Sequence, residues 1–121
     1  GIVLSANINR KQNVLSTTRD AAKVQISSLL EQLNSLKKTQ ELNETTKSNL
    51  KLKIDQLNKQ LNIGSTEFDE LLQSRVELFN LERDLINLET EISLTQLGFL
   101  RATGQLKAIL KVSPTLKRED L

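Results

Sequence analysis

Apolar residues in the first half of the chain recur at alternating intervals of four and three. From Leu15 this stepping visits fourteen positions without a slip, and ten of them are apolar. The positions are Leu15, Arg19, Ala22, Ile26, Leu29, Leu33, Leu36, Gln40, Asn43, Lys47, Leu50, Ile54, Leu57 and Leu61. Such a heptad pattern is typical of a left-handed coiled-coil seam. It predicts a first helical arm over about residues 10–61, roughly 75–80 Å long at ~1.5 Å per residue, which must pack lengthwise against something.

The second half of the chain carries two such seams. The first consists of Leu71, Ser74, Leu78, Leu81, Leu85, Leu88, Ile92, Thr95, Phe99 and Ala102. The second consists of Leu72, Val76, Phe79, Arg83, Ile86, Thr90, Ser93, Leu97 and Leu100. The two adjacent seams give the second arm an apolar face wider than one antiparallel partner can cover. We therefore expect the second arm to touch two neighbours, in a larger bundle or an oligomer.

A bend separates the two arms at residues 62–66. Gly64 can take the left-handed backbone conformation that commonly ends a helix. Ser65 or Thr66 can cap the next helix, and Thr66 with Asp69 has the spacing of a capping box. The helix dipole favours the acids of the first turn, which are Glu67, Asp69 and Glu70. The pattern predicts an all-α fold, a long antiparallel helical hairpin with two arms of unequal length.

The two ends of the chain carry weaker signals. The branched apolar residues of "GIVLSANI" can finish a β-strand before the first arm. The second arm is expected to cover about residues 67–103, with a short helix and a fraying tail over 105–121 that contains Pro114. The chain lacks an initiating Met and the features of a signal peptide, so we expect a mature fragment or an excised domain.

The composition suits helix packing better than chemistry. Aromatic residues are limited to three Phe, so Leu and Ile must supply the burial. Without His or Cys the chain has no Cys–His or Ser–His pair and no usual zinc site, and we expect no metal and no cofactor. The net charge is only +2, and basic and acidic residues are interspersed, which argues against nucleic acid as a partner. No apolar run reaches the roughly 18–20 residues of a membrane-spanning helix.

Neighbouring carboxylates are the candidates for acid–base chemistry, namely Glu67 with Glu70 and Glu89 with Glu91. Such chemistry needs a pocket that desolvates two carboxyl groups and separates their pKa values. A solvated helix surface with interspersed Lys and Arg offers no such pocket. We therefore expect no enzymatic activity and no catalytic residue.

Several polar residues lie on the seams. Gln40, Asn43 and Lys47 occupy three successive seam positions of the first arm. Polar seam residues can fix register and partner number at some cost in stability, or face a solvated channel or a flexible midsection. Arg19 and Arg83 are expected to extend their charged ends to solvent.

One long stretch joins a Gly bend, an acidic first turn, a heptad helix and a closing "ATGQL": "LNIGSTEFDELLQSRVELFNLERDLINLETEISLTQLGFLRATGQL". In this order of features the chain resembles the outer-membrane efflux protein family, the TolC-like channels of Gram-negative bacteria. Upstream, "LSANINRKQNV" is similar to the junction where a barrel strand enters the long periplasmic helix. The resemblance covers about residues 1–106.

The resemblance implies a periplasmic coiled-coil hairpin of a trimeric outer-membrane channel for efflux or type I secretion. Its bend would dock a periplasmic adaptor protein and, through it, an inner-membrane pump. The implied docking tip comprises Ile63, Gly64, Ser65, Thr66, Phe68, Leu71 and Leu72. Glu70 is the implied candidate for an acid at the pore mouth. Leu61 and Gln73 depart from the family pattern, and the barrel strands and the second hairpin are missing, so this chain alone would not form a channel.

Other interpretations of the same residues stay open. The bend "NIGST" also fits a plain turn with Gly as the helix stop, and Glu70 also fits an acid that only complements the helix dipole. The chain could instead be the α-hairpin of a periplasmic adaptor, which should be flanked by Gly-rich lipoyl-like half-motifs that neither end shows. It could also be a cytosolic coiled-coil scaffold, which should keep a single narrow seam.

Overall fold

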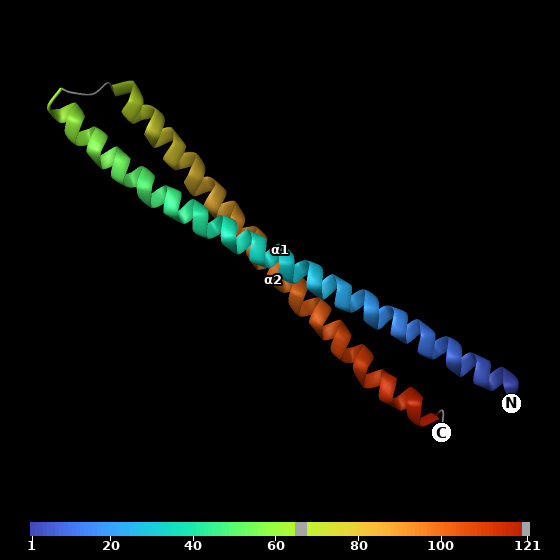
Figure 1. Cartoon of the computed structure of the whole chain (residues 1–121). Helices are drawn as coiled ribbons and strands as arrows, with labels where there is room; N and C mark the ends of the chain where they lie inside the picture. Colours follow the sequence, from blue (N-terminus) through green and yellow to red (C-terminus); the bar gives the residue numbers. More distant parts are fainter. Residues whose placement is uncertain (65–67, 120–121) are drawn as a thin grey trace. The chain divides into compact units, whose positions relative to one another are not determined.

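The computed structural model describes the backbone of residues 1–64 and 68–119 and the side chains of 1–64 and 68–111. Over these residues the chain forms two helices, α1 (Ile2–Asn62) and α2 (Phe68–Glu119) (Figure 1). The helices differ in length, with 61 and 52 residues. The predicted all-α hairpin, with arms of unequal length and a bend at about 62–66, is confirmed.

The contacts divide the chain into two compact units. The bend unit is Asn34–Ser93, and the terminal unit comprises Gly1–Leu33 and Leu94–Leu121. Each unit combines a stretch of α1 with a stretch of α2. In the bend unit the two stretches run side by side in opposite directions from the turn (Figure 1).

The heptad seam of each helix, which we call the inner seam, is the part shielded from solvent. On α1 every heptad position from Leu15 to Leu61 is buried or half-buried. On α2 the same holds for every position of the first seam, from Leu71 to Ala102. The seams predicted from sequence are therefore the surfaces along which the helices pack.

Leucine and isoleucine form the core of the bend unit. Ile54, Leu57 and Leu71 are buried, and three partly buried residues pack against them, Leu50, Leu61 and Leu78. Full burial of a side chain of this size contributes roughly 1.5–3 kcal/mol. The core lies directly beside the turn, so the two helices are fixed to each other where the chain reverses.

The terminal unit packs with smaller side chains. Ala22 and Ala102 are buried there. A Cβ on Gly98 would stand 3.7 Å from Leu29 Cδ2, an ordinary packing distance. Small residues on the inner seam therefore replace part of the leucine packing of the bend unit.

Both ends of the hairpin differ from the sequence-based expectation. Helix α1 begins at Ile2, so the expected strand in "GIVLSANI" is wrong and the arm starts before residue 10. The Ser5 N–H donates to the Gly1 carbonyl at 3.1 Å, which sets the first turn. The half-buried Ile8 and Gln12 continue the inner seam backward, and this packing context overrides the weak strand propensity of branched residues.

Helix α2 passes through Gly104 and continues to Glu119, so the expected break at 103–105 is also wrong. Glycine inside a helix costs about 1 kcal/mol relative to alanine. Beyond Gly104, Leu106 and Ile109 remain half-buried at heptad spacing and favour continuing the helix. The expected tail containing Pro114 lies within α2.

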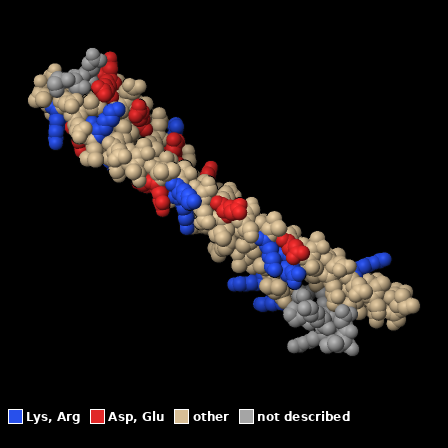
Figure 2. All heavy atoms as spheres, viewed as in Figure 1, with Lys and Arg blue, Asp and Glu red and all other residues tan. Residues whose placement is uncertain are grey.

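Threonine hydroxyls on these helices bond to their own backbone. Thr18 Oγ1 donates to the Val14 carbonyl at 2.8 Å, four residues earlier. The same contact recurs at Thr39, Thr45, Thr46, Thr90 and Thr103. Most charged side chains are exposed, and on the face shown in Figure 2 basic and acidic side chains are interspersed, in places side by side. The bonds to the carbonyl four residues earlier give these threonine hydroxyls a hydrogen-bond partner within their own helix.

Candidate functional site

The turn begins with a glycine in the left-handed conformation. Gly64 has φ of 73° and is the one residue with positive φ among those described. Its N–H donates to the Leu61 carbonyl at 3.0 Å, and the Ile63 N–H donates to the Lys59 carbonyl at 3.3 Å. These bonds satisfy carbonyls at the end of α1, and the predicted helix stop at Gly64 is confirmed. The predicted caps, Ser65 and Thr66, lie outside the described residues, as does Glu67.

The remaining residues of the predicted tip separate into exposed and buried ones. Ile63 is 79% exposed and Phe68 is 60% exposed. Leu72 is half exposed and points away from the core. Leu71 is only 3% exposed and belongs to the core with Ile54 and Leu57, so it is not placed to dock a partner.

Two acids follow the turn at the start of α2. Asp69 and Glu70 lie in the first helical turn and are exposed. Negative charge at this place complements the helix dipole. The implied role of Glu70 at a pore mouth stays a prediction.

The second seam of α2 is exposed throughout its length, at all nine positions from Leu72 to Leu100. At about 100° of rotation per residue, it lies about 150° around the helix from the inner seam. The two seams therefore lie on nearly opposite faces, and the prediction of one wide apolar face is wrong. Helix α2 instead carries one apolar face toward α1 and another directed away from it.

In the bend unit this second face includes four large apolar side chains, which we call the outer stripe. Their exposed fractions are 49% at Leu72, 53% at Val76, 66% at Phe79 and 63% at Ile86. Phe79 and Ile86 also line a shallow hollow with Glu82, Arg83 and Asn87. Single exposed apolar residues are ordinary, but a regular stripe of them makes this face a candidate interaction surface.

The residues that flank the outer stripe differ on its two sides. One side carries uncharged amides at successive heptad positions, Gln73, Asn80 and Asn87. The other side carries Arg75, Glu82 and Glu89 at the same spacing. Beyond the amides an acid recurs every seven residues, at Glu70, Glu77, Asp84 and Glu91. Sequence reasoning missed these columns, although assigning each residue of α2 a heptad position would have shown them.

The polar residues predicted on the seams lie between the helices. Gln40, Asn43 and Lys47 are half-buried on the inner seam of the bend unit. This placement agrees with a role in fixing register.

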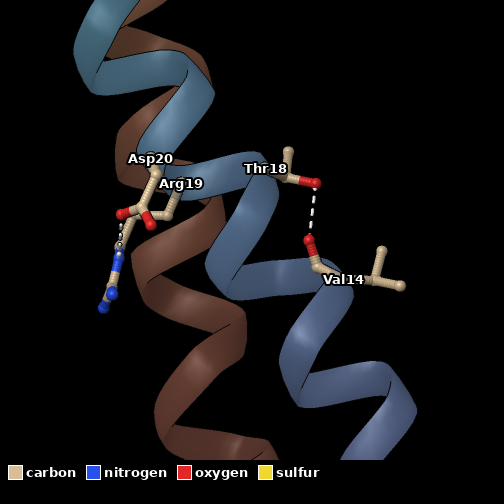
Figure 3. Close-up of polar contacts among 4 residues, drawn as sticks. All are labelled: Val14, Thr18, Arg19 and Asp20. Carbon is tan, nitrogen blue, oxygen red and sulfur yellow. Dashed lines mark hydrogen bonds and ion pairs between the residues drawn. The ribbon is translucent and has the colours of Figure 1, made fainter.

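The two arginines on the seams each form a long ion pair with the aspartate that follows them in the chain. Arg19 Nε is shielded from solvent without a hydrogen-bond partner, and it lies 3.7 Å from Asp20 Oδ1 (Figure 3). Arg83 Nη2 lies 3.7 Å from Asp84 Oδ1 on the exposed face. Exposed pairs at this distance contribute little to stability, roughly 0–1 kcal/mol.

The described residues were compared with the requirements of a metal site and of a membrane-spanning helix. Among them no three His, Cys, Asp or Glu residues come together as metal ligands. Neither helix, within the part described, has a stretch apolar and long enough to cross a membrane. Two further hollows are each lined by residues of α1 alone, around Asn7 and around Leu42. The candidate functional surfaces are thus the bend and the outer stripe.

Comparison with known proteins found no matching family model, no matching curated protein and no matching solved structure. The function is therefore argued from these two surfaces.

Proposed function

We propose that this chain is a non-catalytic helical hairpin that docks another protein through its bend. More specifically, we propose the periplasmic hairpin of a TolC-like outer-membrane channel for efflux or secretion, with a periplasmic adaptor as the partner. The observation that carries the proposal is the pair of exposed apolar residues, Ile63 and Phe68, at the two ends of the turn.

The packing beneath the turn supports a docking role. Leu57 and Leu71 are buried directly below it, so the helix ends are held in place. The Gly64 bonds fix where α1 stops. A fixed scaffold that presents exposed apolar side chains loses little conformational entropy when a partner binds.

The class of partner comes from the sequence resemblance. The Gly bend, the acidic first turn and the heptad arms agree with the TolC-like pattern. Two other landmarks of that pattern, the strand entering the first arm and a close of the second arm near Gly104, are helical in this chain. The assignment to the channel family therefore depends on the bend and the arms.

The test replaces the exposed residues of the tip one at a time. Ile63→Ser and Phe68→Ser should each weaken binding to a purified periplasmic adaptor of an efflux pump about tenfold or more, measured by titration calorimetry. Leu42→Ser is the matched control, because Leu42 is 69% exposed on α1 of the same unit and away from the turn. All three variants should retain the helical circular dichroism of the parent.

Unchanged adaptor binding by both tip variants would refute docking through the bend. Binding of the tip to an outer-membrane channel protein in place of an adaptor would favour the alternative, an adaptor hairpin. If neither class of protein binds, the cytosolic scaffold becomes the better interpretation.

A further inference from the structure

We propose that the outer stripe is the contact face of an antiparallel dimer of this chain, in which α2 packs against α2 of a second copy. The stripe consists of Leu72, Val76, Phe79 and Ile86, and it lies on the side of α2 directed away from α1. Only Leu72 is shared with the predicted docking tip. The two surfaces can therefore be tested separately, and the twofold dimer would replace the trimer that the resemblance implies.

The shape of the face fits another helix. Phe79, Glu82, Arg83 and Ile86 line the shallow hollow on α2. Their spacing of i, i+3, i+4 and i+7 is that of the four residues that surround a knob in coiled-coil packing. A helix with an apolar side chain at heptad spacing can therefore insert that side chain into the hollow.

The charges beside the stripe select a second copy in antiparallel orientation. Arg75 and Glu82 stand one heptad apart on the same flank of the stripe. A twofold axis between residues 77 and 78 relates α2 to α2 of the second copy. Arg75 of each copy then lies on the same flank as Glu82 of the other, about 3 Å away along the helix axis. This gives two complementary pairs from one surface, as a symmetric interface requires. In a parallel dimer Arg83 would face Arg83 of the second copy instead.

The same axis also pairs the apolar residues. Val76 meets Phe79 of the second copy, and Leu72 of the second copy reaches the hollow bounded by Phe79 and Ile86. The apolar stem of Arg83 can cover that leucine while its charge stays near solvent. On the other flank Gln73 of each copy approaches Asn80 of the other, so two uncharged amides meet without a like-charge contact.

Arg75 is available for the intermolecular pair. Its Nη2 donates to Asn58 Oδ1 at 3.4 Å, a long hydrogen bond that engages one of the five guanidinium N–H groups. The side chain is exposed. The remaining donors can therefore bind Glu82 of the second copy.

The first experiment measures self-association of the whole chain by sedimentation equilibrium. The parent should form dimers, and Phe79→Ser should raise the dimer dissociation constant at least about a hundredfold, because the interface loses the burial of two phenylalanine side chains. Leu42→Ser, an exposed leucine on α1 of the same unit, should leave the constant unchanged. Circular dichroism should show the same helicity for all three.

The second experiment exchanges the charges. Arg75→Glu or Glu82→Arg alone should weaken the dimer roughly tenfold, since each creates two like-charge contacts. The double variant Arg75→Glu with Glu82→Arg should return to within about threefold of the parent. Lys38→Glu on α1 is the control and should have no effect.

The third experiment fixes the orientation. The chain has no Cys, so single cysteines at Asn80 or Asn87 can carry spin labels without side reactions. In the antiparallel dimer the two labels should be offset along the helix axis by about 8 Å for Asn80→Cys and about 28 Å for Asn87→Cys. A parallel dimer would give similar distances for both.

Four outcomes would overturn the inference. These are a monomer at about 100 µM, a trimer, a dimer that survives Phe79→Ser, and charge exchange without recovery. A monomer would mean that another protein or another segment of a longer chain covers the stripe. A trimer would remove the dimer and leave the proposed channel function standing, whereas a dimer without adaptor binding would do the reverse.

Discussion

The stretches of α1 and α2 in the bend unit have similar inner faces and different outer faces. Both bury leucine and isoleucine along one heptad seam. On the outward side, α1 carries charged residues, among them Lys38, Glu41, Asp55 and Lys59. The outward side of α2 carries the outer stripe, and Arg83 is the one charged residue of the second seam between Leu72 and Ile86. The inner seams account for the packing of the two helices, and the apolar outer face of α2 takes no part in it.

The largest expected effect is a difference in the free energy of unfolding between variants of the inner and the outer face of each helix. Leu57→Ala and Leu85→Ala should each lower the free energy of unfolding by about 2–4 kcal/mol, because both side chains are buried. Leu52→Ala and Ile86→Ala, which are exposed, should change it by less than about 0.5 kcal/mol when the chain is monomeric. Urea unfolding followed by circular dichroism measures all four. Equal losses at Leu85 and Ile86 would show that both faces of α2 are covered within one chain.

A middle-sized effect concerns the polar part of the inner seam. Asn43→Leu should raise the free energy of unfolding by about 1 kcal/mol, since a half-buried amide is replaced by an apolar side chain. The same change should reduce the specificity of pairing, because polar seam residues disfavour other registers and other partner numbers. Sedimentation should then show additional oligomers. Ser48→Leu, at an exposed position of α1, is the control and should not stabilise the hairpin.

The smallest expected effect has opposite signs at two glycines. Gly64→Ala should destabilise the hairpin by about 1 kcal/mol, because φ of 73° strains any residue with a Cβ. Gly104→Ala should stabilise it by up to about 1 kcal/mol, since Gly104 lies inside α2 and a Cβ there meets no atom within 4 Å. Thermal unfolding of both variants measures the difference. The same sign at both positions would contradict the distinction between the turn and the helix.

The sequence predicted the parts of the fold that depend on repetition. The inner seams were correct at every position because each leucine of a heptad is supported by those four and three residues away. Gly64 was also predictable, since few residues tolerate its backbone conformation. The second seam is visible in the sequence, but the expectation that it adjoins the first is wrong, because a rotation of about 100° per residue places the two about 150° apart.

The errors at the ends have a different physical origin. The strand expected at "GIVLSANI" and the break expected at Gly104 both came from intrinsic propensities worth about 1 kcal/mol or less. Half-buried seam residues favour the helix instead, namely Ile8 at the end of the first stretch and Leu106 just beyond Gly104. Of the candidate tip, Ile63 and Phe68 agree with a surface role, whereas the burial of Leu71 follows from its place on the inner seam.

The turn at Gly64 also has a consequence for the order in which the hairpin folds. Contacts beside the turn join residues close in sequence, such as Leu57 and Leu71, whereas Leu29 and Gly98 are separated by most of the chain. Closing a loop costs more entropy as the loop lengthens. We therefore expect the bend unit to form first and pairing to spread outward from it, with each closed layer shortening the search for the next.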